Sequence, residues 1–186
     1  MSRDLINRPQ YVSQLVGHKD VDLVKIITGI RRCGKSSLLE LFKKHLVAEG
    51  ISESNIISMN LQSLKFENLK DYRNFYQHVA SSIPAEGRTY LLFDEIQSVI
   101  GFEKAIESFR LEYDVDIYLT GSNAHLLSTE LSTLLSGRYV EIKMLPLSFA
   151  EFLTFNEFDD ALSVQQKFRL YFRFGGMPIL KLSGVI

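Results

Sequence analysis

The sequence predicts an α/β protein, with a parallel sheet of about five strands covered by helices on both faces. Two observations lead to this prediction. Short apolar runs typical of buried strands alternate along the chain with longer segments of helical periodicity. Polar motifs follow three of these runs, and motifs in that position meet at the carboxyl ends of parallel strands.

The composition is that of an ordinary globular protein, with 186 residues, 46% hydrophobic and 23% charged. A net charge of −1 provides no general attraction for a polyanion. Cys33 is the only cysteine, which excludes an internal disulfide and a zinc pattern and suits a cytoplasmic protein. No apolar stretch approaches the roughly 20 residues that span a bilayer. The first residues open no apolar run, so we expect no signal peptide.

The chain is predicted to begin with helix, strand and helix. Residues 2–20 are expected to form a short helix that Pro9 interrupts. The apolar run 23–28 predicts a buried strand. Residues 36–49 predict a helix whose apolar stripe follows the 3.6-residue period and consists of Leu38, Leu39, Phe42 and Leu46.

Between that strand and helix lies the stretch Gly29-Ile30-Arg31-Arg32-Cys33-Gly34-Lys35-Ser36, which fits the phosphate-binding pattern G-x-x-x-x-G-K-[ST]. The two glycines allow consecutive backbone N–H groups to face one anion, and the following helix dipole favours that anion. Lys35 supplies a charge for the β- and γ-phosphates, and Ser36 a hydroxyl for Mg²⁺. We expect the nucleotide to be bound by Gly29, Arg31, Arg32, Cys33, Gly34, Lys35, Ser36 and Ser37.

Three side chains of the first helix leave two interpretations open. Arg8, Tyr11 and His18 either belong to a solvated or partly packed helical face, or lie in a segment that covers the adenine or ribose side of the site.

The next elements are a strand over residues 56–61 and a helix over 66–82. The helix carries an aromatic and aliphatic stripe that we expect to be core rather than a stacking platform: Leu69, Tyr72, Phe75, Tyr76 and Val79.

An acid pair, Asp94-Glu95, closes the apolar run 90–93, which is typical of a central parallel strand. Burying carboxylates is costly without a partner, and a bound Mg²⁺ would supply one. The pair resembles a Walker B motif, in which Asp94 would hold Mg²⁺ through water and Glu95 would polarise the attacking water. The alternative is the acidic start of a helix or loop.

A helix over residues 101–112 leads to a strand over 116–119, which ends in small polar residues. Ser122 or Asn123, more readily Asn123, would serve as a sensor of the γ-phosphate or of the attacking water. The alternative is a turn with a helix N-cap.

The last part is predicted to contain a helical or irregular segment over 125–135, a strand over 139–144, and helices over 148–155 and 159–174. Ser148 and Glu151 fit a capping box at the start of the first of these helices. The predicted divisions are an N-terminal helical segment 1–20, a core 21–147 and a helical segment 148–186.

Several motifs together resemble a family of prokaryotic AAA-like P-loop ATPases over nearly the whole chain. They are the stretches 29–36, 92–97, 119–123, 136–138, 145–152 and 174–178. The resemblance implies a three-layer P-loop NTPase fold with strand order 5-1-4-3-2, binding of ATP and Mg²⁺, and hydrolysis with Glu95 as the base. Arg138 matches a recurrent arginine of the family. It would be an arginine finger or γ-phosphate contact, acting either within its own chain or in trans from a neighbouring copy in a homo-oligomer, or else a surface or structural arginine.

The expected function is that of an ATPase domain whose Mg-ATP cycle drives a conformational change in a larger protein. The alternative is a nucleotide-binding interaction module with negligible hydrolysis. A small-molecule kinase is disfavoured because no arginine-rich lid is found, and a GTPase because no N-K-x-D motif occurs. Members of the family continue beyond a segment like 175–178, so we expect an N-terminal fragment. Without a basic stripe, nucleic acid is not a predicted partner.

Overall fold

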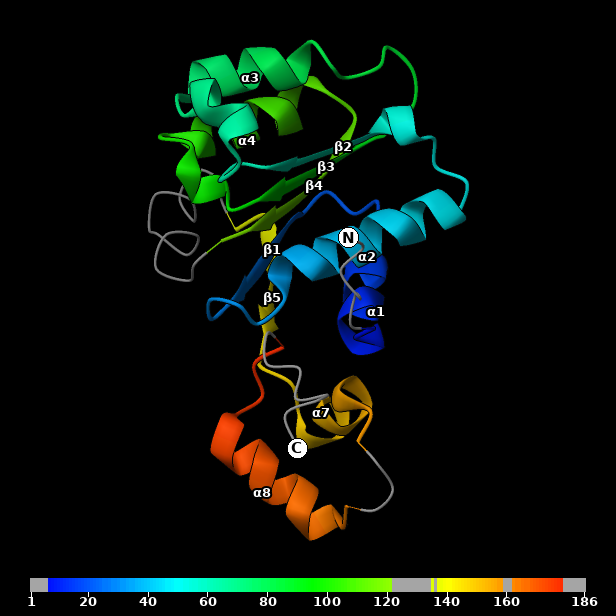
Figure 1. The fold of residues 1–186 in the computed structure, drawn as a ribbon. Coiled ribbons are helices and arrows are strands. Elements are labelled where there is room, and N and C mark those ends of the chain that lie inside the picture. The colour runs from blue at the N-terminus through cyan, green and yellow to red at the C-terminus, as the bar shows by residue number, and fades with distance from the viewer. Residues whose placement is uncertain (1–6, 122–134, 136, 159–161, 179–186) are drawn as a thin grey trace.

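A five-stranded parallel sheet forms the centre of the computed structural model, which describes residues 7–121, 135, 137–158 and 162–178. The strands lie in the order β2-β3-β4-β1-β5 (Figure 1). They are β1 Val24–Gly29, β2 Ile56–Asn60, β3 Thr89–Asp94, β4 Val115–Thr120 and β5 Tyr139–Met144. Both β1 and β3 are buried along their whole length. The strand order confirms the predicted order 5-1-4-3-2 and the P-loop NTPase fold class.

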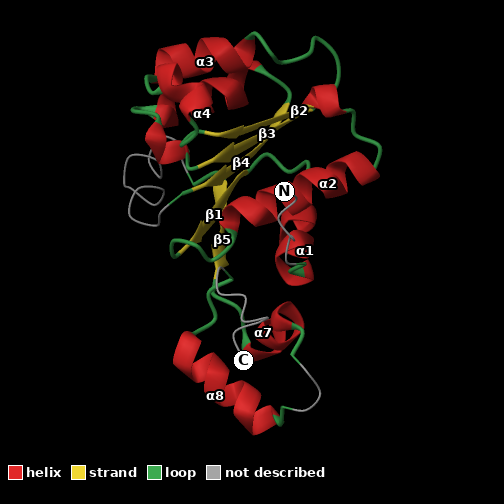
Figure 2. Ribbon diagram, in the orientation of Figure 1, coloured by secondary structure: helices red, strands yellow, loops and turns green. Residues whose placement is uncertain are grey.

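Helices cover both faces of the sheet and give the molecule three layers (Figure 2). The helices α1 Pro9–Gly17 and α2 Lys35–Ala48 lie on one face, and α3 Tyr72–Ala80 and α4 Phe102–Glu112 on the other. Each face has its own apolar core. Phe42, Leu46 and Leu92 belong to the first core. Phe75, Phe93 and Phe109 belong to the second.

Two further helices, α7 Phe149–Asn156 and α8 Val164–Phe174, pack against each other beyond β5 (Figure 1). Backbone pairing joins the two ends of this helical pair, because the Leu147 N–H donates to the Gly176 carbonyl at 2.6 Å. A Cβ on Gly176 would lie 2.2 Å from the Leu147 carbonyl oxygen, so only glycine permits this approach. Within the described ranges, no helix is long and apolar enough to cross a membrane.

The first predicted helix needs correction. Pro9 does not interrupt it but begins it, because proline at the first helical position loses no hydrogen bond there. The helix then ends at Gly17.

The helix predicted over 66–82 is also wrong in its first half. A 3₁₀ segment, Leu64–Leu69, comes first, and α3 begins only at Tyr72. The break occurs because the Asp71 carboxylate accepts the Arg73 N–H as an N-cap, while the Asp71 backbone bridges to Ile100. The predicted stripe is core nonetheless, since Phe75 and Val79 are fully buried and the remaining members pack with them.

The helices α7 and α8 both begin with a capping box. Ser148 and Glu151 form the predicted capping box of α7. In α8 a second box, from Ser163 and Gln166, sets the start at Val164 rather than at the predicted residue 159.

Candidate functional site

The loop between β1 and α2 has the backbone of an anion nest. Gly29, Arg32 and Gly34 have φ of 150°, 68° and 104°, all in the region that disfavours side chains. A Cβ on Gly29 would lie 2.4 Å from the Met144 carbonyl oxygen and 2.8 Å from the Cys33 Sγ. The first glycine of the pattern is therefore required by close packing as well as by its dihedral angle.

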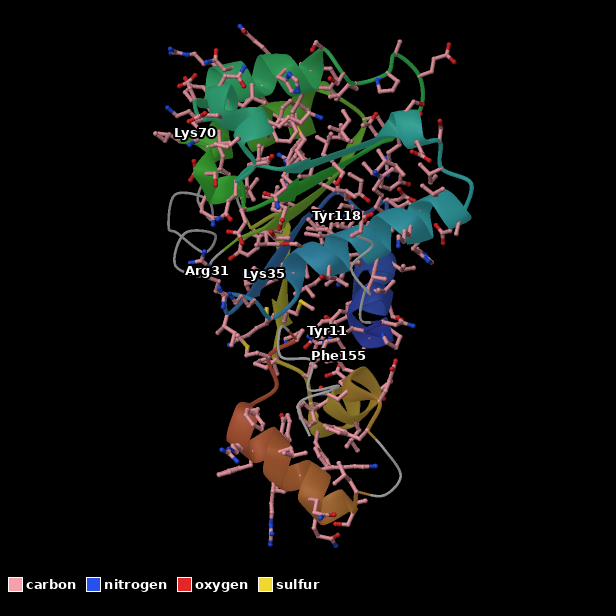
Figure 3. The ribbon with its side chains drawn as sticks, viewed as in Figure 1. Tyr11, Arg31, Lys35, Lys70, Tyr118 and Phe155 are labelled. Atoms are coloured by element: carbon pink, nitrogen blue, oxygen red, sulfur yellow. The ribbon has the colours of Figure 1, made fainter. Side chains whose placement is uncertain are left out.

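Lys35 lies across this loop, at the N-terminus of α2 (Figure 3). Its Nζ donates to the Gly29 carbonyl at 3.0 Å and to the Ile30 carbonyl at 3.3 Å, and the residue is only 6% exposed. Arg31 and Arg32 are both exposed at the same end of the sheet. The loop thus holds the ammonium group of Lys35 within it, and the long, exposed side chains of Arg31 and Arg32 carry two further positive charges outside it.

The remaining predicted loop contacts fall on the first turn of α2 and just before it. Ser36 is exposed and Ser37 half-buried, so both lie near the mouth of the loop. Cys33 is fully buried, and this burial raises the pKa of its thiol although Lys35 and Arg8 oppose the shift. Burial therefore disfavours a reactive thiolate at Cys33.

Asp94 ends β3 in a buried position, 6% exposed. Its carboxylate accepts hydrogen bonds from the Thr120 hydroxyl and from the Asn60 amide, the latter at 2.8 Å. The Ser36 hydroxyl lies close enough to lower the pKa of this carboxyl. Burial raises the pKa of Asp94 above its usual value, because these donors are neutral and compensate desolvation only in part. A divalent cation at this carboxylate would supply the missing charge.

Glu95 has a left-handed backbone, φ 56° and ψ 49°, which is uncommon for a residue with a side chain. Its N–H donates to the Thr120 Oγ1 at 3.0 Å, and its carboxylate accepts from the Gln97 side-chain amide. The Thr120 hydroxyl therefore joins both acids, donating to Asp94 and accepting from Glu95. Strain of this kind is found where a side chain must be held in one place.

The structure brings the loop and the acid pair together at the carboxyl edge of the sheet, but it does not bring Arg138 there. Arg138 is exposed at the amino-terminal end of β5, where its carbonyl accepts the Val24 N–H at 3.0 Å. The length of β1 separates it from the loop of its own chain, about 20 Å at the usual rise of a strand. Ser122 and Asn123 lie outside the described residues.

The donor set fits Mg²⁺. Ser36 and Asp94 offer hard oxygen ligands, and the Ser36 hydroxyl lies close enough to Asp94 to lower the pKa of its carboxyl. Among the described residues, no three His, Cys, Asp or Glu side chains gather into a metal site. A magnesium ion here would thus need nucleotide phosphates and water to complete its six ligands.

Sequence comparison identifies the family. A family model described as AAA domain matches residues 22–153, more than half of the chain. This chain belongs to the AAA domain family. The resemblance to AAA-like P-loop ATPases is thereby confirmed.

Two relatives share this domain. One, an uncharacterised protein of Haemophilus influenzae, is 43% identical over 185 residues, which are 98% of this chain and 46% of the relative. The other, an uncharacterised protein of Methanocaldococcus jannaschii, is 33% identical over 169 residues, which are 86% and 36% of the two chains. The chain spans less than half the length of either relative.

Solved structures share the fold. The Walker-type ATPase PABY2304 of Pyrococcus abyssi has a TM-score of 0.62 at 15% identity, covering 94% of this chain and 65% of that one. AMPPCP-bound DnaA of Aquifex aeolicus has a TM-score of 0.53 at 16% identity, covering 87% and 53%. Orc1 of Aeropyrum pernix, solved in complex with DNA, has 0.55 at 12% identity, covering 81% and 48%. At these identities the likeness concerns the fold alone.

Sequence reasoning missed three side chains of this AAA domain that support the acid pair. Asn60 lies opposite Asp94 in the register of β2 and β3, and Thr120 ends the neighbouring strand β4. Gln97 follows two residues after Glu95. The signal was present, because all polar residues at the carboxyl ends of neighbouring strands meet at one edge.

Arg8 is not part of a solvated face, since it is 3% exposed. It lies beside a small apolar cavity of about 20 Å³ next to the loop, lined by Arg8, Cys33, Gly34, Ser37, Leu38, Leu41, Met144 and Pro178. Tyr11 is buried as well and lies at the end of α1 that faces α7 (Figure 3). His18 is half-buried just after the helix.

Proposed function

We propose that this AAA domain binds ATP with Mg²⁺ at the carboxyl edge of its sheet and hydrolyses it. The observation that carries the proposal is Asp94, a buried carboxylate whose hydrogen-bond donors within the described residues are all neutral, next to the phosphate-loop Ser36 and to Glu95. A buried acid in this state gains most from a cation that arrives with the ligand.

In the proposed complex the N–H groups of the loop and Lys35 bind the phosphates. Lys35 would exchange its present acceptors, the carbonyls of Gly29 and Ile30, for phosphate oxygens. Ser36 and Asp94 would hold Mg²⁺, which neutralises charge on the phosphates when bound.

Glu95 is the proposed general base for the attacking water. Its left-handed backbone and the Thr120 contact fix the direction in which its side chain leaves the strand. Gln97 holds the carboxylate and would release it to water in the active complex. Ser122 or Asn123 is proposed as the γ-phosphate sensor, because β4 ends beside β3.

The small cavity beside Arg8 is the proposed entry of the adenine. It borders the loop on the side of α1, and its walls are mainly apolar. A base needs more room than about 20 Å³, so Met144 and Pro178 would have to move apart on binding.

The test is Mg-dependent phosphate release by the wild-type chain and by Glu95→Gln, each over a range of protein concentrations. We expect Glu95→Gln to retain ATP affinity while turnover falls about 100-fold, within the usual contribution of a general base. Equal turnover in the two proteins would contradict the role of Glu95.

One observation favours the alternative, a nucleotide-binding module with negligible hydrolysis. Arg138 lies at the opposite edge of the sheet from the loop of its own chain, so a single copy has no arginine finger from this position. Turnover that rises with concentration would support a second copy that supplies Arg138 in trans. Tight binding without turnover at any concentration would support the alternative.

For the whole protein we propose that the ATP cycle drives a conformational change. The relatives are more than twice as long as the part matched here, so further sequence in them could be moved by the cycle. We place this activity in the cytoplasm, on the strength of one buried cysteine.

A further inference from the structure

The guanidinium of Arg8 uses every donor it has. Its five N–H groups meet five acceptors on three separate segments of the chain. Two bonds form a fork to the Glu151 carboxylate, at 2.8 and 3.1 Å. The other three go to the carbonyls of Leu145 at 2.8 Å, Pro146 at 3.3 Å and Cys33 at 3.4 Å.

Only arginine fits this position. The guanidinium carbon lies 4.5 Å from the centre of the Tyr11 ring, so a flat cation is stacked while its edge points at the acceptors. Tyr11 in turn accepts the Leu145 N–H on its hydroxyl at 3.1 Å. A lysine would keep the charge but could not reach acceptors on three segments at once.

The contact with Cys33 bears on the phosphate loop. The Cys33 carbonyl and the Gly34 N–H belong to one planar peptide, and the described chain contains no cis peptide, so the two groups point in opposite directions. With its carbonyl held by Arg8, this peptide turns the Gly34 N–H away from Arg8. Gly34 and Lys35 begin α2, where amides of the pattern bind phosphate.

The contact with Glu151 connects Arg8 to the N-terminus of α7. Glu151 is the third residue of α7, and its carboxylate also accepts the Ser148 N–H at 2.7 Å in the capping box. One arginine therefore joins the turn of the loop to the N-terminus of α7.

The geometry points to Arg8 as a positioning residue for the phosphate loop, which orients the Cys33–Gly34 peptide so that the Gly34 N–H faces the phosphate. The inference rests on the proposed function only in that a nucleotide phosphate is the ligand of the loop.

The test compares wild type, Arg8→Lys and Arg110→Lys. Arg110 is the matched control, because it also forks a carboxylate, Glu107, at 3.1 and 2.9 Å, and also reaches a second segment at Asp22. It lies on α4, away from the loop. Two readouts are needed: the affinity for a non-hydrolysable ATP analogue with Mg²⁺, and the amide chemical shift of Gly34 without nucleotide.

We expect Arg8→Lys to bind the analogue about tenfold more weakly, which corresponds to about 1.4 kcal/mol, and to shift the Gly34 amide before any nucleotide is added. Arg110→Lys should lower the melting temperature with neither effect. An Arg8→Lys variant that melts earlier but keeps both the affinity and the Gly34 shift of wild type would overturn the inference.

The two proposals fail in different ways. If wild type binds no nucleotide while the Gly34 shift still depends on Arg8, the proposed function fails and the orientation of the peptide by Arg8 stands. If wild type binds nucleotide and Arg8→Lys binds it equally well, the inference fails and the proposed function stands.

Discussion

The two edges of the sheet both bury an aspartate, and they treat it differently. At the amino-terminal edge, Asp116 of β4 forms an ion pair with Lys25 of β1, and these residues are 2% and 0% exposed. The Tyr118 hydroxyl and the Asp20 N–H also donate to Asp116, at 2.9 and 2.8 Å. At the carboxyl edge, the donors that reach Asp94 from the described part of the chain, the Asn60 amide and the Thr120 hydroxyl, are both neutral.

This difference indicates that the charge of Asp116 stabilises the fold, whereas the charge of Asp94 serves to bind a ligand. At the amino-terminal edge burial lowers the pKa of Lys25, but the attraction of Asp116 opposes this shift and the pair is complete within the protein. At the carboxyl edge burial raises the pKa of Asp94, because its charge is incompletely compensated. At the amino-terminal edge the buried charges of Lys25 and Asp116 already neutralise each other. At the carboxyl edge a bound cation would neutralise the charge of Asp94.

The same substitution at both edges tests this comparison, and the largest effect is expected at the amino-terminal edge. Asp116→Asn would leave Lys25 charged and buried, which costs about 3 to 5 kcal/mol of unfolding free energy. Urea denaturation measures this loss, and nucleotide affinity of the folded protein should not change. A loss below about 1 kcal/mol would show that Lys25 finds other compensation.

At the carboxyl edge, Asp94→Asn should have the opposite effects: activity should fall and stability should not. The unfolding free energy should stay equal or rise, because a poorly compensated charge is removed from a buried site. Mg-dependent phosphate release should fall about 100-fold, about 2.7 kcal/mol in activation free energy. If this variant were strongly destabilised and still active, Asp94 would be a structural acid like Asp116.

A smaller effect is expected at the Arg8–Glu151 pair, a complete pair that lies on the ligand side. Burial would raise the pKa of Glu151, but the hydrogen bonds from Arg8, Ser148 and Gln10 outweigh it and hold the pKa at about 2 instead of the ordinary 4.5. Since the pKa is lower in the folded state, the stabilisation is present above pH 4.5 and is lost as the pH falls towards 2.

Acid titration of stability in wild type and Glu151→Gln measures this contribution. Between these pH values wild type should lose about 1 kcal/mol more than the variant, a modest value because solvent screens a carboxylate that is partly exposed. Parallel curves for the two proteins would contradict the assignment.

The phosphate loop and the acid pair could be predicted because their signals are local in sequence, whereas the strand order followed from the resemblance to AAA-like P-loop ATPases. The phosphate loop is one stretch of eight positions, and Asp94 and Glu95 directly follow an apolar run. To place these two motifs in one site, it is enough to know that the carboxyl ends of parallel strands meet at one edge of the sheet.

The partners of these residues could not be predicted with the same ease. Asn60 and Thr120 approach Asp94 only once the register of β2, β3 and β4 is known. Arg8 meets Glu151 across 143 positions of sequence, through a contact that no periodicity encodes. Pro9 was misjudged because proline both breaks and begins helices, and the sequence pattern alone does not tell which.

The bond between Leu147 and Gly176 has a consequence for the order of folding. It closes a short loop of chain whose contacts, between α7 and α8, are all near in sequence. The central sheet needs the far more distant pairing of β1 with β4, for which a long segment must be closed. The contacts of the helical pair are therefore much more local in sequence than the strand pairings that position β1 and the phosphate loop, and local contacts favour fast folding.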